Sequence, residues 1–305
     1  MPGRFHDRAT RPVRGPKELL RWRFGKKEAR RADWHAIDAV RPAIVSGGAA
    51  ALTSGDPVAV WIGHATWALR LGGRVIVIDP IWSTSIGGVS PRLVPPGVAL
   101  DAMPAIDLVL VTHDHRDHMD MPTLAKLPES ATYVVPLGNG ARLAKRNVIE
   151  LDWWETKDLG SLEVTLVPAR HWSMRMPWNR NDTLWGGFVI RSPEGALYHS
   201  GDTAWGDHFA EIARRCGPID AAMLPIGAYA PRWFMEPQHM DPVEAGRAFD
   251  ALGARHLFAM HWGTFRLTDE AIGEPPEKLR AWWQQRGHPD ERLWVAGVGE
   301  SRRLT

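Results

Sequence analysis

The sequence is poor in cysteine and has no long apolar run. Cys216 is the only cysteine among 305 residues, which excludes an intrachain disulfide and a zinc site built from thiolates. No apolar run approaches the roughly 18 residues of a membrane span, and the N-terminus lacks the apolar core, about 7 to 15 residues long, of a secretory signal. We therefore expect a cytoplasmic protein, with peripheral binding to the inner face of the membrane as a further option.

Charge is distributed unevenly along the chain. The formal net charge is only +2, but residues 1–31 contain eleven lysines and arginines against three acidic residues. Such a segment binds anionic lipid or nucleic acid, or is simply solvated. Because the rest of the chain is net acidic, no nucleic-acid partner is expected. We predict two parts, a basic N-terminal arm with helices over residues 1–55 and a catalytic domain over residues 56–305.

The spacing of apolar residues predicts strands that first follow one another and later alternate with helices. Strands are expected at residues 58–62, 67–71, 74–78, 107–112, 132–136, 162–168, 185–191, 196–200, 219–225, 256–260 and 293–297. Helices are expected at residues 16–34, in a shorter segment that ends near residue 45, and at residues 121–127, 208–216, 242–252 and 276–286. This order fits an αββα sandwich, in which two mixed β-sheets lie face to face with helices on their outer faces.

A cluster of histidines directly follows one buried strand. Residues 108–111 are apolar, and His113, His115, Asp117 and His118 come after them. Residues two apart on an extended segment point the same way, so His113 and His115 can hold one metal while the following turn directs Asp117 and His118 towards a second. The alternative is a polar loop that leads into a short helix. Clustered imidazoles without another use are rare, which favours a two-metal site.

Three further candidate ligands stand at other strand ends, His171, Asp202 and His261. A two-metal site needs about six or seven protein donors, and these residues complete such a set. Taken singly, each is a weak indication, because a histidine at a strand end is more often a surface residue and an aspartate there often starts a turn. The indication is strong only for the set as a whole.

The order of these motifs resembles the metallo-β-lactamase superfamily over about residues 56–303. The resemblance implies a metallo-β-lactamase fold with two zinc ions, manganese or iron being the alternatives. It implies one metal on His113, His115 and His171, a second on Asp117, His118 and His261, and Asp202 as the bridge between them. Asp79 matches the first acidic motif of the superfamily and would support the ligands from outside; otherwise it starts a turn with Pro80.

Seven short blocks resemble one family of this superfamily, the N-acyl-phosphatidylethanolamine-hydrolysing phospholipases D. They follow in the order of that family, at residues 61–66, 150–155, 184–186, 225–229, 231–235, 261–265 and 299–302. The resemblance implies a zinc phosphodiesterase that cleaves N-acyl-phosphatidylethanolamine into an N-acylethanolamine and phosphatidate at a membrane surface. Two features depart from the family: Arg116 stands where animal members usually carry tyrosine, and residues 82–96 match poorly.

Residues 171–178 and 229–235 are too apolar for ordinary solvated loops. We expect them to form an apolar mouth around the metals that suits acyl chains or a membrane, unless their tryptophans anchor the loops in the core. The candidate substrate contacts are Arg116, Trp172, Arg175, Trp178, Tyr229, Trp233 and His239. His239 either protonates the leaving oxygen or makes a structural hydrogen bond, and Arg175 either pairs with phosphate or makes a surface ion pair. His64 stands in a strand-ending turn and is expected to be structural.

The expected chemistry is hydrolysis of a phosphodiester by a hydroxide that bridges two metals. Two divalent cations, the two aspartates and the hydroxide give a loaded site of about +1, which attracts an anion. The candidate catalytic residues are Asp117, Asp202 and His239. The same metals can open a lactone, so a sugar-phosphate lactonase is the main alternative, and a lipid-binding protein without catalysis is another. The sequence leaves a monomer and a homodimer open.

Overall fold

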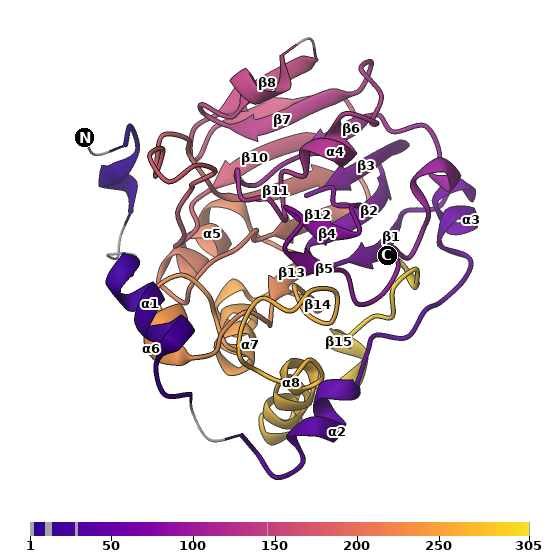
Figure 1. Cartoon of the computed structure of the whole chain (residues 1–305). Helices are drawn as coiled ribbons and strands as arrows, with labels where there is room; N and C mark the ends of the chain where they lie inside the picture. Colours follow the sequence, from indigo (N-terminus) through magenta and orange to yellow (C-terminus); the bar gives the residue numbers. More distant parts are fainter. Residues whose placement is uncertain (1–2, 10–13, 28–29, 145, 305) are drawn as a thin grey trace.

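Two seven-stranded β-sheets lie face to face, with helices on their outer sides (Figure 1). The computed structural model describes residues 3–9, 14–27, 30–144 and 146–304. Each sheet is mixed, with three antiparallel and three parallel neighbouring strand pairs. The αββα sandwich expected from the order of strands and helices is therefore confirmed.

The strands divide between the sheets in the order of the chain, except for the last one. The first sheet runs in the order β16 (Ser301–Arg303), β1 (Val58–Gly63), β2 (Thr66–Leu71), β3 (Arg74–Ile78), β6 (Leu108–Leu110), β7 (Thr132–Pro136) and β8 (Asn147–Leu151). The second sheet runs in the order β15 (Leu293–Trp294), β14 (His256–Met260), β13 (Ala221–Pro225), β12 (Gly195–His199), β11 (Gly187–Ser192), β10 (Glu163–Val167) and β9 (Thr156–Asp158). A small hairpin of β4 (Ser85–Ile86) and β5 (Ser90–Pro91) stands apart from both.

Helices cover the outer face of each sheet. The second sheet is covered by α7 (Pro242–Leu252), which packs against α5 (His208–Cys216) and α8 (Glu274–Gln285). Helix α7 begins as the sequence predicts, because Asp241 accepts a hydrogen bond from the backbone N–H of Glu244 in a capping box. Three further helices are α3 (Gly48–Thr53), which lies against the first sheet, α4 (Met121–Leu124) and α6 (Arg232–Met235).

The main core lies between the two sheets. Trp67 on β2 packs against Phe258 on β14, with ring centroids 5.8 Å apart, and against Trp294 on β15, at 5.5 Å. All three side chains are buried. Large aromatic side chains thus join the inner faces of the two sheets and fix the edge at which their polar loops meet.

The N-terminal region differs from the sequence-based expectation. The predicted helix over residues 16–34 is wrong in extent, because α1 (Pro16–Phe24) ends where Gly25 takes an extended conformation. A second helix, α2 (Trp34–Ala39), ends earlier than the predicted position near residue 45. Helix α3, which the sequence did not predict, begins at Gly48. Strands β8, β9 and β16 were missed because they are short edge or near-edge strands with exposed polar residues.

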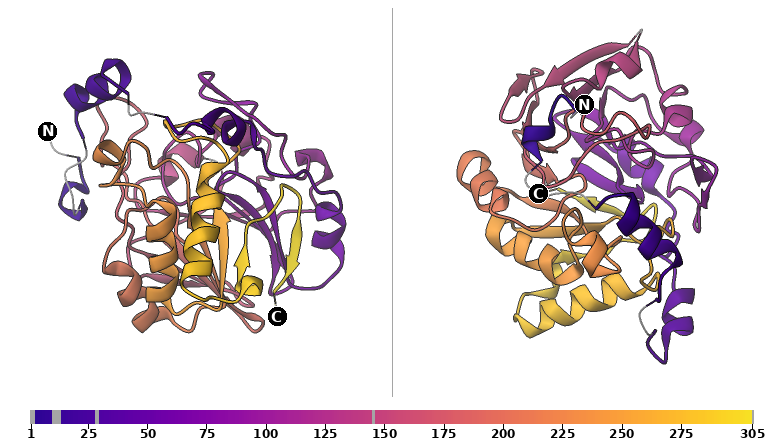
Figure 2. Two further views of the ribbon diagram at one scale, coloured as in Figure 1. Left: turned by 90° about the horizontal axis from the view of Figure 1, so that it is seen from below. Right: turned by 60° about the vertical axis from the view of Figure 1, so that its left-hand side comes forward.

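The described part of the arm packs against the catalytic domain (Figures 1 and 2). Phe5 is buried in the main core, and its backbone N–H donates to the carbonyl of Asn181 at 2.8 Å. Trp22 of α1 stacks on Phe234 of α6 with centroids 4.9 Å apart and donates to Asp269. The boundary at residue 55 stays a prediction. No helix among the described residues has both the length and the apolar character needed to cross a membrane.

Candidate metal centre

The fold brings the predicted ligands to one edge of the sandwich. His113 and His115 follow β6 of the first sheet, whereas Asp202 follows β12 and His261 follows β14 of the second. Strands β12, β13 and β14 are parallel, so their carboxyl ends meet at the same edge. His171 follows β10, which runs in the same direction as β12 because both pair antiparallel with β11. Residues far apart in sequence therefore converge.

Three imidazoles and one carboxylate form a first cluster. Nε2 of His113 lies 3.0 Å from Nδ1 of His115, and Nε2 of His171 lies 3.2 Å from that same Nδ1. Asp202 completes the group, in which all four ligand atoms lie within 4.8 Å of one another. Ligand nitrogens about 2.0–2.1 Å from a tetrahedral zinc ion would be separated by about 3.4 Å. The spacing is therefore that of donors around a shared cation.

A second cluster lies beside the first. Oδ2 of Asp117 is 3.7 Å from Nε2 of both His118 and His261. The fourth member of this cluster is His64, whose Nε2 hydrogen-bonds Oδ2 of Asp117 at 2.9 Å. All four side chains are buried or nearly so. This group offers a second place for a cation.

Asp202 lies between the clusters, as a bridging ligand would. Its Oδ2 is 3.2 Å from Nε2 of His118 and 3.8 Å from Nε2 of His171, and its Oδ1 is 3.1 Å from Nε2 of His261. One carboxylate thus faces donors of both groups.

The state of the donor atoms fits a bound metal. Nε2 of His118 and His261 and Oδ1 of Asp202 are buried and have no hydrogen-bond partner within the described residues. Leaving such groups unpaired costs about 1–3 kcal/mol each, unless a cation takes their lone pairs. Imidazole and carboxylate donors suit zinc, and they also accept manganese or iron.

Outer partners fix the orientation of the imidazoles. Asp79 is fully buried, and its Oδ2 accepts from Nδ1 of His118 at 2.7 Å, while its Oδ1 accepts from the backbone N–H of Thr112 at 2.7 Å. Nδ1 of His171 donates to the carbonyl of Gln238 at 3.0 Å. A partner on the far nitrogen turns Nε2 towards the cluster and makes it a better metal ligand. Asp79 thus contacts a proposed ligand from outside the clusters, and its supporting role stays a prediction.

Burial and charge shift the pKa values in this centre. Burial lowers the pKa of His113 well below its usual value and that of His171 to about 3, so both offer a neutral nitrogen. Burial alone would raise the pKa of Asp202, but His118 and His261 lower it well below its usual value. Burial alone would lower the pKa of His261, but Asp202 and Asp117 raise it to about 9. The carboxylates therefore attract positive charge.

His64 is the residue that sequence reasoning placed outside the site. Its ring lies 4.0 Å from that of His261, and it hydrogen-bonds Asp117. It stands in the turn between β1 and β2 with a positive φ of 56°. The sequence carries no signal for this role, because the left-handed backbone of a non-glycine residue, which often marks a functional position, is visible only in the structure.

We expect His64 to hold Asp117 for the second metal. In His64→Gln an amide N–H still reaches Asp117, whereas His64→Ala leaves the carboxylate without that partner. The alanine variant should bind the second metal about 10 to 100-fold more weakly, and the glutamine variant should resemble the wild type. Titration with Co²⁺, followed by its visible absorption, measures this. Equal losses in both variants would instead make His64 a ligand itself.

His239 and Trp172 lie beside the clusters. The His239 ring is 5.2 Å from that of His171 and 5.7 Å from that of His261. Nδ1 of His239 is buried and unpartnered within the described residues, and burial lowers the pKa of this imidazole to about 3. Trp172 meets the ring of His115 edge-on at 4.7 Å. Both side chains are in reach of a group bound at the metals.

The aromatic residues of the predicted mouth differ in their surroundings. Trp178 is 77% exposed, as expected for a mouth open to lipid. Trp233 is half-buried, and the guanidinium of Arg21 lies 4.6 Å from its ring centroid. Tyr229 is buried, and its hydroxyl donates to Glu274 at 2.6 Å. The arm thus covers part of the predicted mouth, and Tyr229 has a partner inside the protein.

The two arginines proposed as anion contacts also differ. Nη1 of Arg175 donates to the carbonyls of Asp114 and Met119, at 3.1 and 2.8 Å, so it stabilises the loop that carries the ligands. This contact replaces the surface ion pair considered for Arg175. Arg116 is exposed, and its guanidinium donates to the carbonyl of Arg175 at 3.3 Å. Substrate contacts by these residues stay predictions.

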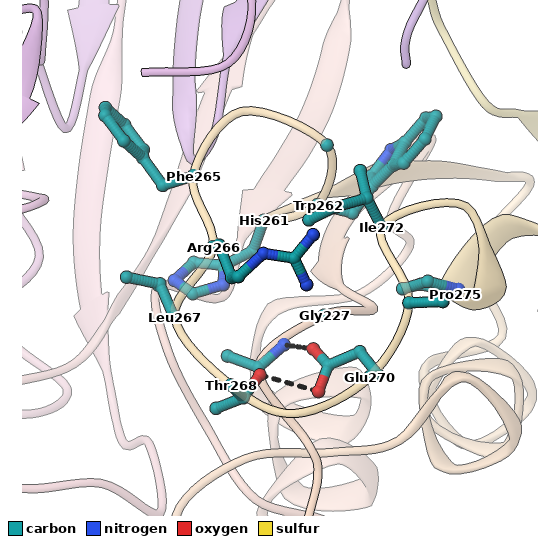
Figure 3. A pocket seen from close by; sticks show the side chains of 13 residues that line it. Gly227, His261, Trp262, Phe265, Arg266, Leu267, Thr268, Glu270, Ile272 and Pro275 are labelled. Carbon is teal, nitrogen blue, oxygen red and sulfur yellow. Dashed lines mark hydrogen bonds between the residues drawn. The ribbon is translucent and has the colours of Figure 1, made fainter. Parts of the chain in front are cut away.

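A small cavity of about 20 Å³ lies behind His261 (Figure 3). Glu270 faces into it and accepts hydrogen bonds from the hydroxyl of Thr268 at 2.6 Å and from the backbone N–H groups of Ala228 at 2.7 Å and Ala230 at 3.0 Å. These bonds tie the loop after β13 to the loop after β14. They thereby support the backbone that carries His261.

Comparison with known proteins identifies the family. Residues 74–262 match the family model of the β-lactamase superfamily domain. The chain belongs to this superfamily. A metallo hydrolase of this fold from the archaeon Ignicoccus hospitalis superposes with a TM-score of 0.63 over 82% of this chain and 98% of that one, at 23% identity. That likeness shows the shared fold.

Two relatives within the superfamily are more similar to this chain in sequence. An uncharacterised protein of Mycobacterium tuberculosis is 41% identical over 235 residues, which cover 72% of this chain but only 62% of that protein. The N-acyl-phosphatidylethanolamine-hydrolysing phospholipase D 1 of Caenorhabditis elegans is 34% identical over 244 residues, which cover 73% of this chain and 68% of that enzyme. A protein of Pyrobaculum aerophilum named as a metal-dependent hydrolase is 32% identical over 72% of this chain and 89% of that one. This chain combines the fold of the superfamily with two candidate metal clusters.

Proposed function

We propose that the protein is a binuclear zinc phosphodiesterase of the phospholipase D type. It would cleave N-acyl-phosphatidylethanolamine, or a related phospholipid, into an N-acylethanolamine and phosphatidate. The observation that carries this proposal is the arrangement of the two clusters around Asp202. The worm phospholipase D, which is 34% identical to this chain, supports the choice of substrate class.

The charge of the site supports an anionic substrate. Two divalent cations held against the carboxylates of Asp117 and Asp202 leave a net charge of about +2, which attracts a phosphodiester. When bound, such a pair of cations lowers the pKa of water to about 7 and stabilises negative charge on phosphoryl oxygens.

Residues of the chain supply the rest of the chemistry. His118 and His171 are held in one orientation by Asp79 and by the carbonyl of Gln238, so the site is fixed before substrate binds. His239 lies beside both clusters with an unpartnered Nδ1. Because burial keeps this imidazole neutral, it would donate a hydrogen bond to the phosphate or to the leaving oxygen.

Exposed apolar side chains support work at a membrane surface. On α1, Leu19, Leu20 and Phe24 are 49%, 58% and 80% exposed, and Trp178 is 77% exposed. Arg21 and Arg23 stand between Leu20 and Phe24 in the sequence of α1, and Lys17 precedes Leu19. Basic and apolar side chains together are typical of a helix that lies in the interface of an anionic membrane. The inner face of the cytoplasmic membrane is the proposed location.

A substrate panel tests the proposed reaction. Zinc-loaded protein should hydrolyse N-acyl-phosphatidylethanolamine and simple phosphodiesters faster than lactones or thioesters, and chelation should abolish this hydrolysis. Product release is measured by mass spectrometry before and after zinc is restored. Faster opening of a sugar-phosphate lactone would instead make the protein a lactonase, and two bound metals without any turnover would favour a lipid-binding role.

A further inference from the structure

An open cavity of about 500 Å³ flanks the ligand loop. One wall is the hairpin of β4 and β5, and the other is formed by Arg116, Arg175 and the start of α4. The two walls are in contact at Gly87. The side chain of Arg116 lies so close to this glycine that a Cβ at its position would be only 3.2 Å from Cδ of Arg116. None of the seven proposed metal ligands lines the cavity. Since Arg116 stands between His115 and Asp117 in the chain, the cavity adjoins the metal centre.

The hairpin wall is anchored to the loop after His261. Arg92 donates from Nε to the carbonyl of Ser83 at 3.0 Å and from Nη2 to that of Ile81 at 2.6 Å. Its guanidinium lies 4.8 Å from the ring centroid of Phe265, and the backbone N–H of Leu93 donates to the carbonyl of Thr264 at 2.8 Å. These contacts fix the shape of the cavity, which lies between two loops that carry proposed metal ligands.

The cavity carries positive charge without an internal counter-ion of equal strength. Its cations are Arg116, Lys126 and Arg175, and its only acid is Asp120. Oδ2 of Asp120 already accepts from the hydroxyls of Ser83 and Thr123, at 2.6 and 2.5 Å. An anion that enters the cavity would therefore meet a surplus of positive charge.

The cationic groups keep donors for such an anion. In the part of the chain that the structure describes, the ammonium of Lys126 makes no hydrogen bond or ion pair, and the guanidinium of Arg116 reaches only the carbonyl of Arg175 and the sulfur of Met176. Burial lowers the pKa of Arg175, and the neighbouring cation of Arg116 lowers it further. Within this part of the chain, Lys126 and Arg116 therefore have free donors, and the effect of Arg116 on Arg175 indicates that positive charges lie close together.

We propose that this cavity binds a second anionic group of the substrate, a carboxylate or a phosphate on the headgroup, while the phosphodiester lies at the metals. The inference rests on the proposed function, because it presupposes a phosphodiester. Arg116 and residues 82–96, the two departures from the phospholipase family, meet in this cavity. A preference for anionic headgroups would therefore distinguish this chain from its relatives.

Two pairs of water-soluble phosphodiesters test the subsite without a membrane. N-acetyl-glycerophosphoserine differs from N-acetyl-glycerophosphoethanolamine by one carboxylate, and glycerophosphoinositol 4-phosphate differs from glycerophosphoinositol by one phosphate. Dissociation constants with the zinc-loaded protein come from calorimetry, and kcat/KM comes from product release. The wild type should prefer the more anionic member of at least one pair. The pair with the larger preference shows whether the cavity binds a carboxylate or a phosphate.

The variants separate charge in the cavity from charge elsewhere. Arg116→Gln should lower the preference about tenfold or more, because one charge-assisted hydrogen bond contributes about 1.5–3 kcal/mol. Lys126→Gln should lower it less, since its ammonium lies on a flexible stem. Lys157→Gln, on the exposed edge strand β9, is the matched control and should keep the preference of the wild type.

The outcomes distinguish the two proposals. An unchanged preference in both Arg116→Gln and Lys126→Gln, or no preference in the wild type, overturns the subsite even if the phosphodiesters are cleaved. If none of the phosphodiesters is cleaved but the anionic member still binds in an Arg116-dependent way, the phosphodiesterase proposal fails and the subsite stands.

Discussion

Replacing Asp202 by asparagine is expected to lower kcat/KM by more than about 100-fold and to reduce bound metal from two ions to about one. Outer partners of metal ligands already contribute about 10 to 100-fold, so a carboxylate that faces both clusters should contribute more. Asparagine keeps the size of the side chain but removes a negative charge between two cations. Metal content by atomic emission and kcat/KM for a soluble phosphodiester measure the effect.

The matched control is Asp207→Asn, whose side chain is fully exposed five residues further along the chain. It should retain the metal content and the activity of the wild type. His115→Ala should behave like Asp202→Asn, since it removes a donor of the first cluster. Circular dichroism should show an intact fold in all three variants. Normal metal loading with full activity in Asp202→Asn would refute the bridging assignment.

Replacing Leu20 and Phe24 together by serine is expected to weaken binding to anionic vesicles by about tenfold or more, at low and at high salt alike. Each apolar side chain that enters the interface contributes about 1.5–3 kcal/mol at full burial, and salt does not screen this contribution. Replacing Lys17 and Lys26 by glutamine should weaken binding only at low salt, because screening acts within about 10 Å at 0.1 M. Vesicle co-sedimentation measures both effects.

Side-chain substitutions are better here than removal of residues 1–31. Trp22 packs on Phe234 and Phe5 is buried in the core, so deletion would expose surface that the arm normally covers. Ile44→Ser is the control, because Ile44 is 65% exposed and lies outside α1. Loss of binding only at low salt in the Leu20 and Phe24 variant would show that the arm binds by charge alone.

Much of the fold could be predicted because its signals are local. Apolar runs mark the central strands, and His113, Asp202 and His261 each stand one to three residues after the end of such a strand. Edge strands such as β9 have no such signal, since their pairing partner and not their own burial makes them strands. The bounds of the helix in the arm failed for a different reason: Gly25 has a low helix propensity and is a local stop signal, but the prediction extended the helix past it.

The rest of the site depends on contacts between distant residues. His64 meets Asp117 only because a turn of the first sheet is brought against the ligand loop. Tyr229 stands in an apolar segment that the sequence assigns to the mouth, but its hydroxyl reaches Glu274. Neither contact has a local signature. A single sequence can therefore indicate which side chains are candidate ligands. It is less able to indicate which distant residues contact those side chains.

Each metal cluster takes donors from both sheets, which has a consequence for how the protein matures. His113 and His115 from the first half of the chain join His171 and Asp202 from the second, and His118 joins His261. Neither half can assemble a complete cluster on its own. The affinity for metal would therefore depend on correct docking of the two halves, and metal uptake during biosynthesis would stabilise the assembled sandwich over misdocked chains.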